Sequence, residues 1–480
     1  MQKKFITNLA FLIIINLLVK PFWILGIDRA VQNTVDSNGY GLYYALLNFS
    51  LLLNITLDLG ITNFNNRNIS QNMHLVHKHL SGIIVLRLLL AAFYLVLSVS
   101  IALIIGYKSL ELQMLLMLLF NQVMLSFILY LRSNISGLHY FKTDSVISVL
   151  DRLIMIAICG ALLLYRKDEF HNHIEWYVYS QTAGYLITVC ITLWVLHGKI
   201  SMQRLNWNPA FFMLILKKSA PFAVLIFLMS FYNFFASIMI ERMLPDGAEQ
   251  SGIFAQANRL LDASNMIAFL FGGLLLPLFA HLIKKKQSVE ELTKLSYCLI
   301  SVPAILLISS CMFYKYEIMN LLYKHHEVES GRVLGILVFC FFAMSSNYIF
   351  GTLLTANGSL KQMNIMALSA VVINILLNLY LIPRYKAVGA AYASVTTQFF
   401  TALVQIVLSH RIFNFKIDYK LLWLFLLFSF LTIAFTYMSR YTNVYWLNAL
   451  IIAMGASMLA AFALRLINLK VIAEIMKREE

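Results

Sequence analysis

Charged residues are scarce in this sequence. Of its 480 residues only 12% are Asp, Glu, Lys or Arg, whereas 60% are hydrophobic. Soluble domains carry about 25% charged residues. With a mean hydropathy of +0.77, this composition excludes an ordinary soluble protein and predicts a chain that crosses the membrane many times.

The sequence also lacks several common catalytic and nucleotide-binding motifs. It holds no Walker-type phosphate loop, no nucleotide-binding glycine loop and no credible pair of nucleophile and base. We therefore expect a transporter rather than an enzyme. We expect no cofactor, and no hydrolysis of nucleotide by this chain to power transport.

Patterns typical of disulfides or metal sites are equally sparse. No CxxC spacing occurs, so we expect the five cysteines to be packing thiols. His74, His77 and His79 lie near no cysteine or carboxylate cluster, and we expect a solvated surface there rather than a metal site. The cysteines are Cys159, Cys190, Cys298, Cys311 and Cys340.

The formal net charge of +15 does not indicate nucleic-acid binding, because the basic residues stand singly in the gaps between apolar runs. This distribution is typical of membrane topology and of contact with anionic lipid head groups. With the N-terminus in the cytoplasm, the inner gaps hold 22 Lys and Arg and the outer gaps hold 11. The bias predicts that both termini are cytoplasmic.

Fourteen apolar runs are long enough to span a bilayer, which takes about 20 helical residues. The first begins like a signal peptide but lacks an A-x-A cleavage site, so we expect it to stay as a helix. The predicted fold is an all-α integral membrane protein with about 14 transmembrane helices. The runs are 5–26, 40–62, 80–106, 110–131, 144–165, 175–197, 219–240, 251–282, 295–314, 333–355, 363–382, 387–409, 421–438 and 445–464.

A basic gap at 198–218 divides the runs into two groups of six and a final pair. Its apolar residues bunch on one side and Pro209 lies inside it, so we expect an interfacial helix with a linker; an ordinary loop is the alternative. The predicted domains are an N-terminal six-helix lobe 1–197, a cytoplasmic amphipathic linker 198–218, a C-terminal six-helix lobe 219–410, and two additional helices with a cytoplasmic tail 411–480.

The two groups of six resemble each other weakly. Pro21-Phe22 in the first run corresponds to Pro221-Phe222 in the seventh. Tyr40-Gly41-Leu42-Tyr43 opens the second run, and Ser251-Gly252-Ile253-Phe254 opens the eighth. Internal repeats of this kind are common in transporters, which bind substrate between the repeats.

The eighth run contains the stretch Ser251–His281, SGIFAQANRLLDASNMIAFLFGGLLLPLFAH, which is long enough to span a membrane. Yet it carries Arg259 and Asp262 on one helical face, one turn after Gln256. A charge at the centre of a lipid-facing helix costs about 3 kcal/mol. We therefore interpret this helix as one wall of a polar cavity.

Other spans carry polar faces as well. Lys20 shares a face of the first run with Asn8 and Asn16, and a cation on such a stripe favours a phosphate or carboxylate ligand. The predicted substrate-binding residues are Lys20, Arg87, Arg152, Arg259, Asp262, Asn364, Asn374 and Asn378.

Each of these residues also has a structural interpretation. Buried charges usually pair, and Asp58, Asp151 and Asp262 are available partners. The asparagines alternatively hydrogen-bond between helices. Asp28-Arg29 and Glu241-Arg242 stand at predicted outer helix ends, where we expect them to be solvated.

The eleventh and twelfth runs carry the sharpest motif. The stretch from Asn374-Ile-Leu-Leu-Asn378 through Ile382-Pro383 to Gly389-Ala390-Ala391 resembles the N-x-x-L-N-x-x-L-I-P-x-Y-x-x-x-G-A-A signature of bacterial polysaccharide-unit flippases of the multidrug/oligosaccharidyl-lipid/polysaccharide exporter superfamily. The second run, from Tyr40 to Asp58-Leu59-Gly60-Ile61, is similar to that family's YGxY…DxG pattern. In the motif we expect Pro383 to end the eleventh helix.

The resemblance implies two six-helix lobes around a central cavity with alternating access, driven by a membrane potential or an ion gradient. It implies that the protein moves oligosaccharides on polyprenyl pyrophosphate across the bacterial inner membrane, for O-antigen or capsule synthesis. Membrane lipids, a polysaccharide polymerase and chain-length machinery are the expected partners. Lys20 and Arg259 are the candidates for holding the pyrophosphate.

Three other functions stay open. A lipid II flippase, or a flippase of another lipid-linked glycan, has a similar number of helices. A membrane glycosyltransferase or polymerase would be expected to have a large external loop, whereas the longest external gap here is about 315–332. An exporter of small amphiphilic cations predicts an acidic cavity, whereas these spans hold a balanced to basic set of charges.

Overall fold

The computed structural model describes residues 14–62, 65, 76–138, 140–166, 173–197, 209–416 and 418–467. All regular structure in these ranges is helical, which confirms the predicted all-α fold. Several predictions fall outside the described residues: those on Asn8 and His74, on the side chains of His77 and His79, and on the segments 198–208 and 468–480.

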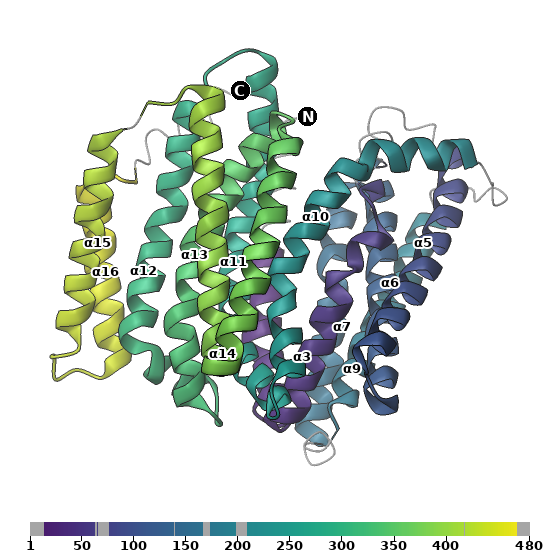
Figure 1. Cartoon of the computed structure of the whole chain (residues 1–480), viewed down its shortest axis with the longest axis horizontal. Helices are drawn as coiled ribbons and strands as arrows, with labels where there is room; N and C mark the ends of the chain where they lie inside the picture. Colours follow the sequence, from purple (N-terminus) through teal and green to yellow (C-terminus); the bar gives the residue numbers. More distant parts are fainter. Residues whose placement is uncertain are drawn as a thin grey trace. The chain divides into compact units, whose positions relative to one another are not determined.

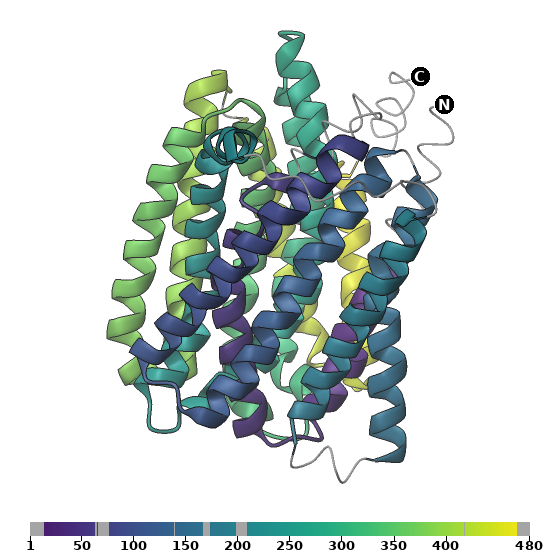
Figure 2. The ribbon, with the colours of Figure 1, turned by 90° about the vertical axis from the view of Figure 1, so that its right-hand side faces the viewer.

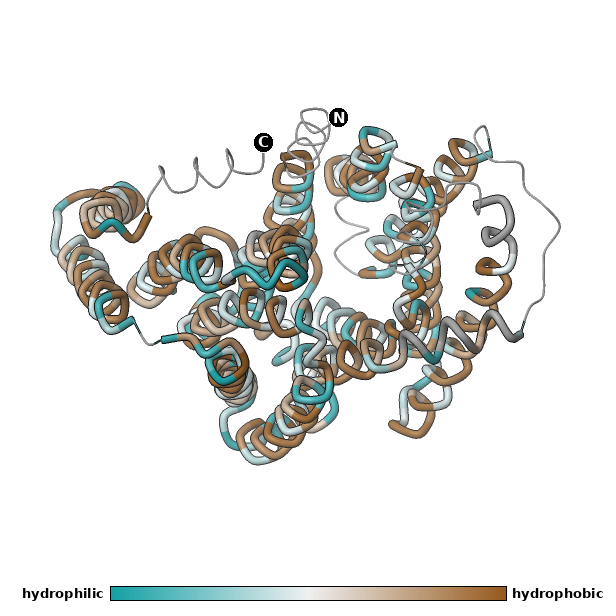
Figure 3. Tube along the Cα trace, turned by 90° about the horizontal axis from the view of Figure 1, so that it is seen from above, coloured by the Kyte–Doolittle hydropathy of each residue, from teal (hydrophilic) through white to brown (hydrophobic). Residues whose placement is uncertain are grey.

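Eleven of the described helices are long and apolar enough to cross a membrane, and apolar residues make up most of the helical trace in Figure 3. Each of the fourteen predicted runs overlaps a described helix, but the exact number of spans stays a prediction. The elements after the first helical residues, 14–22, are η1 (Trp23–Asp28), α2 (Arg29–Gln32), α3 (Ser37–Leu52), η2 (Asn54–Leu57), α5 (Val76–Ile105), α6 (Ser109–Gly137), α7 (Phe141–Tyr165), α9 (Glu175–His197), α10 (Pro209–Met243), α11 (Gly247–Lys284), α12 (Glu290–Leu322), α13 (Glu327–Ala356), α14 (Leu360–Phe413), α15 (Tyr419–Ser439) and α16 (Trp446–Ala463).

The longest element, α14, consists of two helices. Lys386, with φ 52° and ψ −132°, interrupts it, whereas Pro383 lies inside the helix. The expectation that Pro383 ends the eleventh helix was therefore wrong by three residues. A proline removes only its own N–H, which a membrane helix tolerates, whereas a left-handed residue redirects the chain.

The first compact unit comprises Met1–Arg259 and Ala367–Ala390. Within it α6 packs against α3, α5, α7 and α9, and α3 packs against α10. The long helices of this unit run side by side in Figure 2. One buried apolar cluster joins α5, α6 and α7 through residues that include Leu86, Tyr130 and Ile147.

The second compact unit comprises Leu260–Met366 and Ala391–Glu480. Here α12 packs against α13, while α15 and α16 pack against each other and against α12 (Figure 1). Buried hydroxyl contacts join α12 to α15: Ser309 Oγ lies 2.9 Å from Thr436 Oγ1, and Tyr314 OH lies 2.6 Å from Ser439 Oγ. The division into six-helix lobes stays a prediction.

The second predicted run is not one continuous helix. The Asp36 side chain caps α3 by accepting a hydrogen bond from the Gly39 N–H at 2.9 Å. The α-helix ends at Leu52, and the chain continues through η2 to Leu59 and Gly60, which have φ values of 44° and 83°. The DxG motif thus forms a turn rather than a helical face.

The predicted linker joins a spanning helix directly. Its described part, residues 209–218, is helical and continues without a break into the rest of α10. The interfacial position of this segment stays a prediction.

Candidate functional site

The first helix carries a buried carboxylate near its end. Trp23–Asp28 form a π-helical turn, a conformation that is rare and is frequent at functional sites. The helix then continues as α2 to Gln32. Asp28 is only 1% exposed, so the turn places a negative charge inside the first unit.

Four side chains surround the Asp28 carboxylate. Tyr40 OH donates to its two oxygens at 3.0 and 2.9 Å, and Tyr177 OH donates at 2.5 Å. Gln32 Nε2 donates at 3.1 Å, and Arg259 Nε forms an ion pair at 3.0 Å. We call these five residues the Asp28 cluster. Because the carboxylate and the guanidinium balance, the cluster is a neutral link between α2, α3, α9 and α11.

The expectation that Asp28 is solvated at an outer helix end was wrong. The first run was predicted to end at residue 26, but the helix continues to Gln32, so Asp28 lies within it. Sequence analysis also missed Tyr40 and Tyr177 as its donors. A weak signal existed, since Tyr40, Tyr43 and Tyr44 crowd one short stretch of an apolar run.

Lys20 lies two turns before Asp28 on the same helix and is half-buried. It interacts electrostatically with Arg152 and Asp151 of α7. Among the described residues it makes no hydrogen bond or ion pair. We call Lys20, Asp151 and Arg152 the Lys20 cluster; it contains two cations and one carboxylate.

Arg152 is held loosely by that carboxylate. Its Nε lies 3.6 Å from Asp151 Oδ2. The guanidinium carbon lies 5.6 Å from the ring centre of Trp23 and 5.8 Å from that of Tyr185. Aromatic faces hold a cation without neutralising it, so the Lys20 cluster keeps an excess of positive charge.

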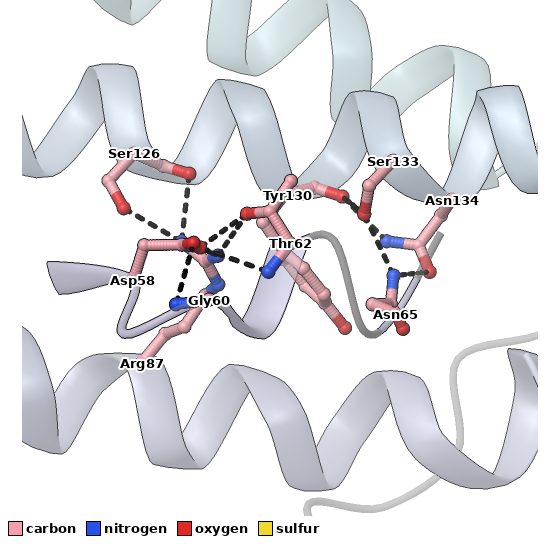
Figure 4. Close-up of polar contacts among 9 residues, drawn as sticks. All are labelled: Asp58, Gly60, Thr62, Asn65, Arg87, Ser126, Tyr130, Ser133 and Asn134. Carbon is pink, nitrogen blue, oxygen red and sulfur yellow. Dashed lines mark hydrogen bonds and ion pairs between the residues drawn. The ribbon is translucent and has the colours of Figure 1, made fainter. Parts of the chain in front are cut away.

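In contrast to Lys20, Arg87 is buried next to a carboxylate. It forms a close ion pair with Asp58 and donates to Ser126 O at 2.9 Å and to Ser126 Oγ at 2.7 Å (Figure 4). Asp58 also accepts from the N–H groups of Gly60, at 3.2 Å, and Thr62, at 3.1 Å. The Arg87 side chain is only 1% exposed. Its contacts with Asp58 and Ser126 join the turn after η2 to α5 and α6.

The remaining predicted site residues belong to neither the Asp28 cluster nor the Lys20 cluster. Asn374 and Asn378 are fully buried in the first unit, where Asn378 Nδ2 donates to Asn374 Oδ1 at 2.9 Å. Asp262 and Asn364 belong to the second unit. The substrate-binding role of all eight residues stays a prediction.

The two short motifs that resemble each other in sequence also meet in space. A Cβ on Gly41 would collide with Ala248 O and would lie 2.6 Å from Gly252 N; a Cβ on Gly252 would lie 3.6 Å from Gly41 Cα. The helices α3 and α11 therefore cross backbone to backbone at these two glycines. Next to the crossing, Asn258 Nδ2 donates to Tyr44 OH at 2.7 Å.

A second polar contact joins the turn before α11 to the interruption of α14. Lys386 Nζ lies 2.6 Å from Asp246 Oδ2, and the Ala387 N–H donates to Gln250 Oε1 at 3.5 Å. The hydrogen bond from Lys386 lowers the pKa of the Asp246 carboxyl. The ion pair is therefore present at neutral pH and is lost only as the pH falls through that lowered pKa.

A family model described as "Polysaccharide biosynthesis protein" matches residues 5–283, which is more than half of the chain. The chain belongs to this family. The matched region includes Lys20, Asp28 and Arg259. No curated protein sequence matches the chain.

Solved structures show the fold of this family member. The lipid II flippase MurJ in an inward closed conformation superposes with a TM-score of 0.71 at 14% identity, covering 92% of this chain and 96% of that one. An inward-facing multidrug resistance MATE transporter of the MOP superfamily gives 0.66 at 15%, covering 85% and 98%. A MOP superfamily transporter from Pyrococcus furiosus gives 0.60 at 15%, covering 85% and 95%.

These similarities agree with the sequence motifs. The protein is a multi-pass membrane protein of the polysaccharide biosynthesis family, with the fold of a flippase and of MOP-superfamily transporters.

Proposed function

We propose that this protein is a flippase for oligosaccharides linked to polyprenyl pyrophosphate. It moves them from the inner to the outer leaflet of the bacterial cytoplasmic membrane by alternating access, for O-antigen or capsule synthesis. It acts as a transporter and not as an enzyme. The two predicted six-helix lobes enclose the path, both termini are cytoplasmic, and a polymerase with chain-length machinery uses the product.

The observation that carries the proposal is the Lys20 cluster. A cation inside a membrane protein is costly unless it is paired. Lys20 nevertheless makes no ion pair among the described residues, and Asp151, the carboxylate that interacts with it electrostatically, lies beside a second cation, Arg152. An anionic group such as a pyrophosphate would supply the missing negative charge. Family membership supports a polysaccharide precursor as the cargo.

Arg259 has a different role in the proposal. Its ion pair with Asp28 uses Nε, and its side chain is still 16% exposed. We expect it to contact the same anionic head as a second, already balanced cation. Removing Arg259 therefore also leaves the Asp28 carboxylate without its cation. Removing Lys20 does not, because Asp151 keeps its ion pair with Arg152.

The test uses the full chain in liposomes that contain a labelled oligosaccharide on polyprenyl pyrophosphate. An impermeant glycan-modifying reagent measures how fast the oligosaccharide reaches the opposite leaflet. Lys20→Ala should lower the transfer rate by about tenfold or more, as expected for the loss of a charge-assisted contact of about 1.5–3 kcal/mol. Lys142→Ala, which removes an exposed cation at the start of α7, should transfer at the wild-type rate. Equal rates for the two variants would refute the anion site.

The same variants can be followed in cells. Lys20→Ala should reduce surface polysaccharide while the protein stays at its normal level in the membrane. Arg259→Ala should reduce both, because it leaves the buried Asp28 carboxylate without its cation. Wild-type polymer in both variants would contradict the phosphate-binding role of these residues.

A lipid II flippase is the second candidate, because a lipid II flippase superposes over 92% of this chain. Both substrates carry a pyrophosphate and a polyprenyl chain, so the Lys20 cluster does not distinguish them. Transfer of labelled lipid II in the same liposomes, without transfer of the oligosaccharide-linked substrate, would favour this second function.

A further inference from the structure

A small cavity lies in the second unit and contains no residue of the Lys20 or Asp28 cluster. It has a volume of about 250 Å³ and is formed by the start of α12, the ends of α13 and α14, and the start of α15. Pockets for whole drug-sized ligands hold about 300–1,000 Å³. This cavity is thus suited to one end of a chain-like molecule rather than to a compact ligand. The topology predicted from the basic residues places it on the cytoplasmic side.

The floor of the cavity is aromatic and aliphatic. Tyr297 lines it, and its ring centre lies 5.9 Å from that of Phe350 and 5.6 Å from that of Phe425. Leu422 at the edge is 54% exposed. Since α15 is a candidate membrane span, an exposed leucine at its start is suited to contact with the hydrocarbon chains of the bilayer.

The rim carries charges of both signs. Lys294 Nζ lies 3.0 Å from Glu290 Oε1 and 3.1 Å from Asp418 Oδ2. The exposed fractions of these side chains are 38% for Lys294, 32% for Glu290 and 38% for Asp418. Two carboxylates therefore share one ammonium and retain accessible surface, so this part of the rim has an excess of negative charge.

A positive charge lies on the segment that connects α14 to α15. Lys416 lines the cavity and is exposed, and His410 lines it from the end of α14. Hydrogen bonds from the Leu421 N–H and from Lys294 lower the pKa of the Asp418 carboxyl, so Asp418 is ionised at neutral pH. The rim therefore offers a cation and a carboxylate pair beside an apolar floor.

We propose that this cavity binds one molecule of phosphatidylethanolamine from the cytoplasmic leaflet. Its phosphate lies against Lys416, its ammonium donates hydrogen bonds to Glu290 and Asp418, and part of one acyl chain lies along Tyr297 and Phe425. The arrangement matches a zwitterionic head group whose positive end is a hydrogen-bond donor. A choline head group has no N–H to donate, and a glycerol head group has no positive charge for the carboxylates.

The test begins with the wild-type full chain in detergent, offered synthetic phosphatidylethanolamine, phosphatidylcholine or phosphatidylglycerol with the same acyl chains. Native mass spectrometry then measures the retained lipid. Phosphatidylethanolamine should be retained as a single molecule and preferentially. Equal retention of the three lipids, or preference for phosphatidylglycerol, would overturn the proposal.

Matched variants then locate the site. Glu290→Gln and Lys416→Ala should each weaken retention about fivefold, as expected for losing one half-exposed charge contact of about 1 kcal/mol. Glu291→Gln and Lys420→Ala remove neighbouring exposed charges that do not line the cavity, and should bind as the wild type does. If all four variants retain the lipid equally, it binds elsewhere and the proposal fails.

A last measurement addresses the other chain-like occupant. Polyprenyl phosphate added in competition should leave phosphatidylethanolamine bound. Displacement of the lipid by polyprenyl phosphate, together with loss of polyprenyl binding in Lys416→Ala, would assign the cavity to the substrate's chain and overturn the proposal. Transport of lipid-linked oligosaccharide by Lys20→Ala is a separate readout, so the two proposals can fail independently.

Discussion

At the scale of single residues, three intramembrane cations have three different environments. Arg87 is enclosed with Asp58 and Ser126, and Arg259 is balanced by Asp28. Lys20 makes no ion pair among the described residues and interacts electrostatically with Asp151, which pairs with Arg152. The sequence identified all of these cations, because a charge inside an apolar run is visible in one dimension. It did not indicate which of them are neutralised, since that depends on which helices meet.

The Arg87–Asp58 pair gives the clearest prediction at this scale. Asp58→Ala leaves a guanidinium that is 1% exposed without its counter-charge, which we expect to lower the unfolding free energy by about 3–5 kcal/mol. Thermal and denaturant unfolding in detergent measure this loss. The double change Asp58→Ala with Arg87→Met should restore much of the stability, because it removes the unpaired charge as well.

An exposed ion pair provides the control for this measurement. Glu317→Ala removes the partner of Arg440, whose side chain is 43% exposed, and should cost less than about 1 kcal/mol. If the Glu317 and Asp58 variants lose the same stability, then burial does not determine the strength of the Arg87–Asp58 pair.

At the scale of elements, local irregularities position the polar side chains. The π turn Trp23–Asp28 precedes α2, and the Asp58-Leu59-Gly60 turn interrupts the second run. Hydropathy predicted both runs as plain helices, because it reports only how apolar a window is. The sequence indicated the Gly41–Gly252 crossing more clearly, because the two glycines occupy corresponding positions in the similar motifs that open the second and eighth runs.

The crossing predicts an asymmetry between two glycines of one helix. Gly252→Ala places a methyl group against the backbone of α3, next to Ser37 O and Gly41 Cα, and should lower stability by about 1–3 kcal/mol through overpacking. Gly273→Ala in the same helix meets nothing within 4 Å and should be neutral or slightly stabilising. Unfolding curves of the two variants compare them directly, and equal stability would show that α3 and α11 do not pack closely.

At the scale of the whole molecule, the basic residues predict which ends of the helices face the cytoplasm. Gln287 precedes α12, whereas Tyr441 lies close to Arg440, which forms an ion pair with Glu317 near the other end of α12. The two positions therefore lie at opposite ends of one spanning helix. Both are exposed.

This arrangement predicts opposite labelling from the two sides of the membrane. In a background with the five native cysteines replaced by serine, Tyr441→Cys should react with an impermeant maleimide in intact cells. Gln287→Cys should react only after permeabilisation. The reverse pattern would invert the predicted topology, and labelling of both in intact cells would contradict α12 as a spanning helix.

The sequence by itself determined that the chain is an all-helical membrane protein, approximately where its spans lie, and which superfamily of flippases and exporters it resembles. These properties follow from local hydropathy and from short motifs, which need no knowledge of the neighbours in space. Only the tertiary structure decided that Asp28 is buried against Arg259 and that Arg87 is enclosed with Asp58. The free energy of a buried charge depends on groups from other helices, and the spacing of residues along one chain segment does not contain that information.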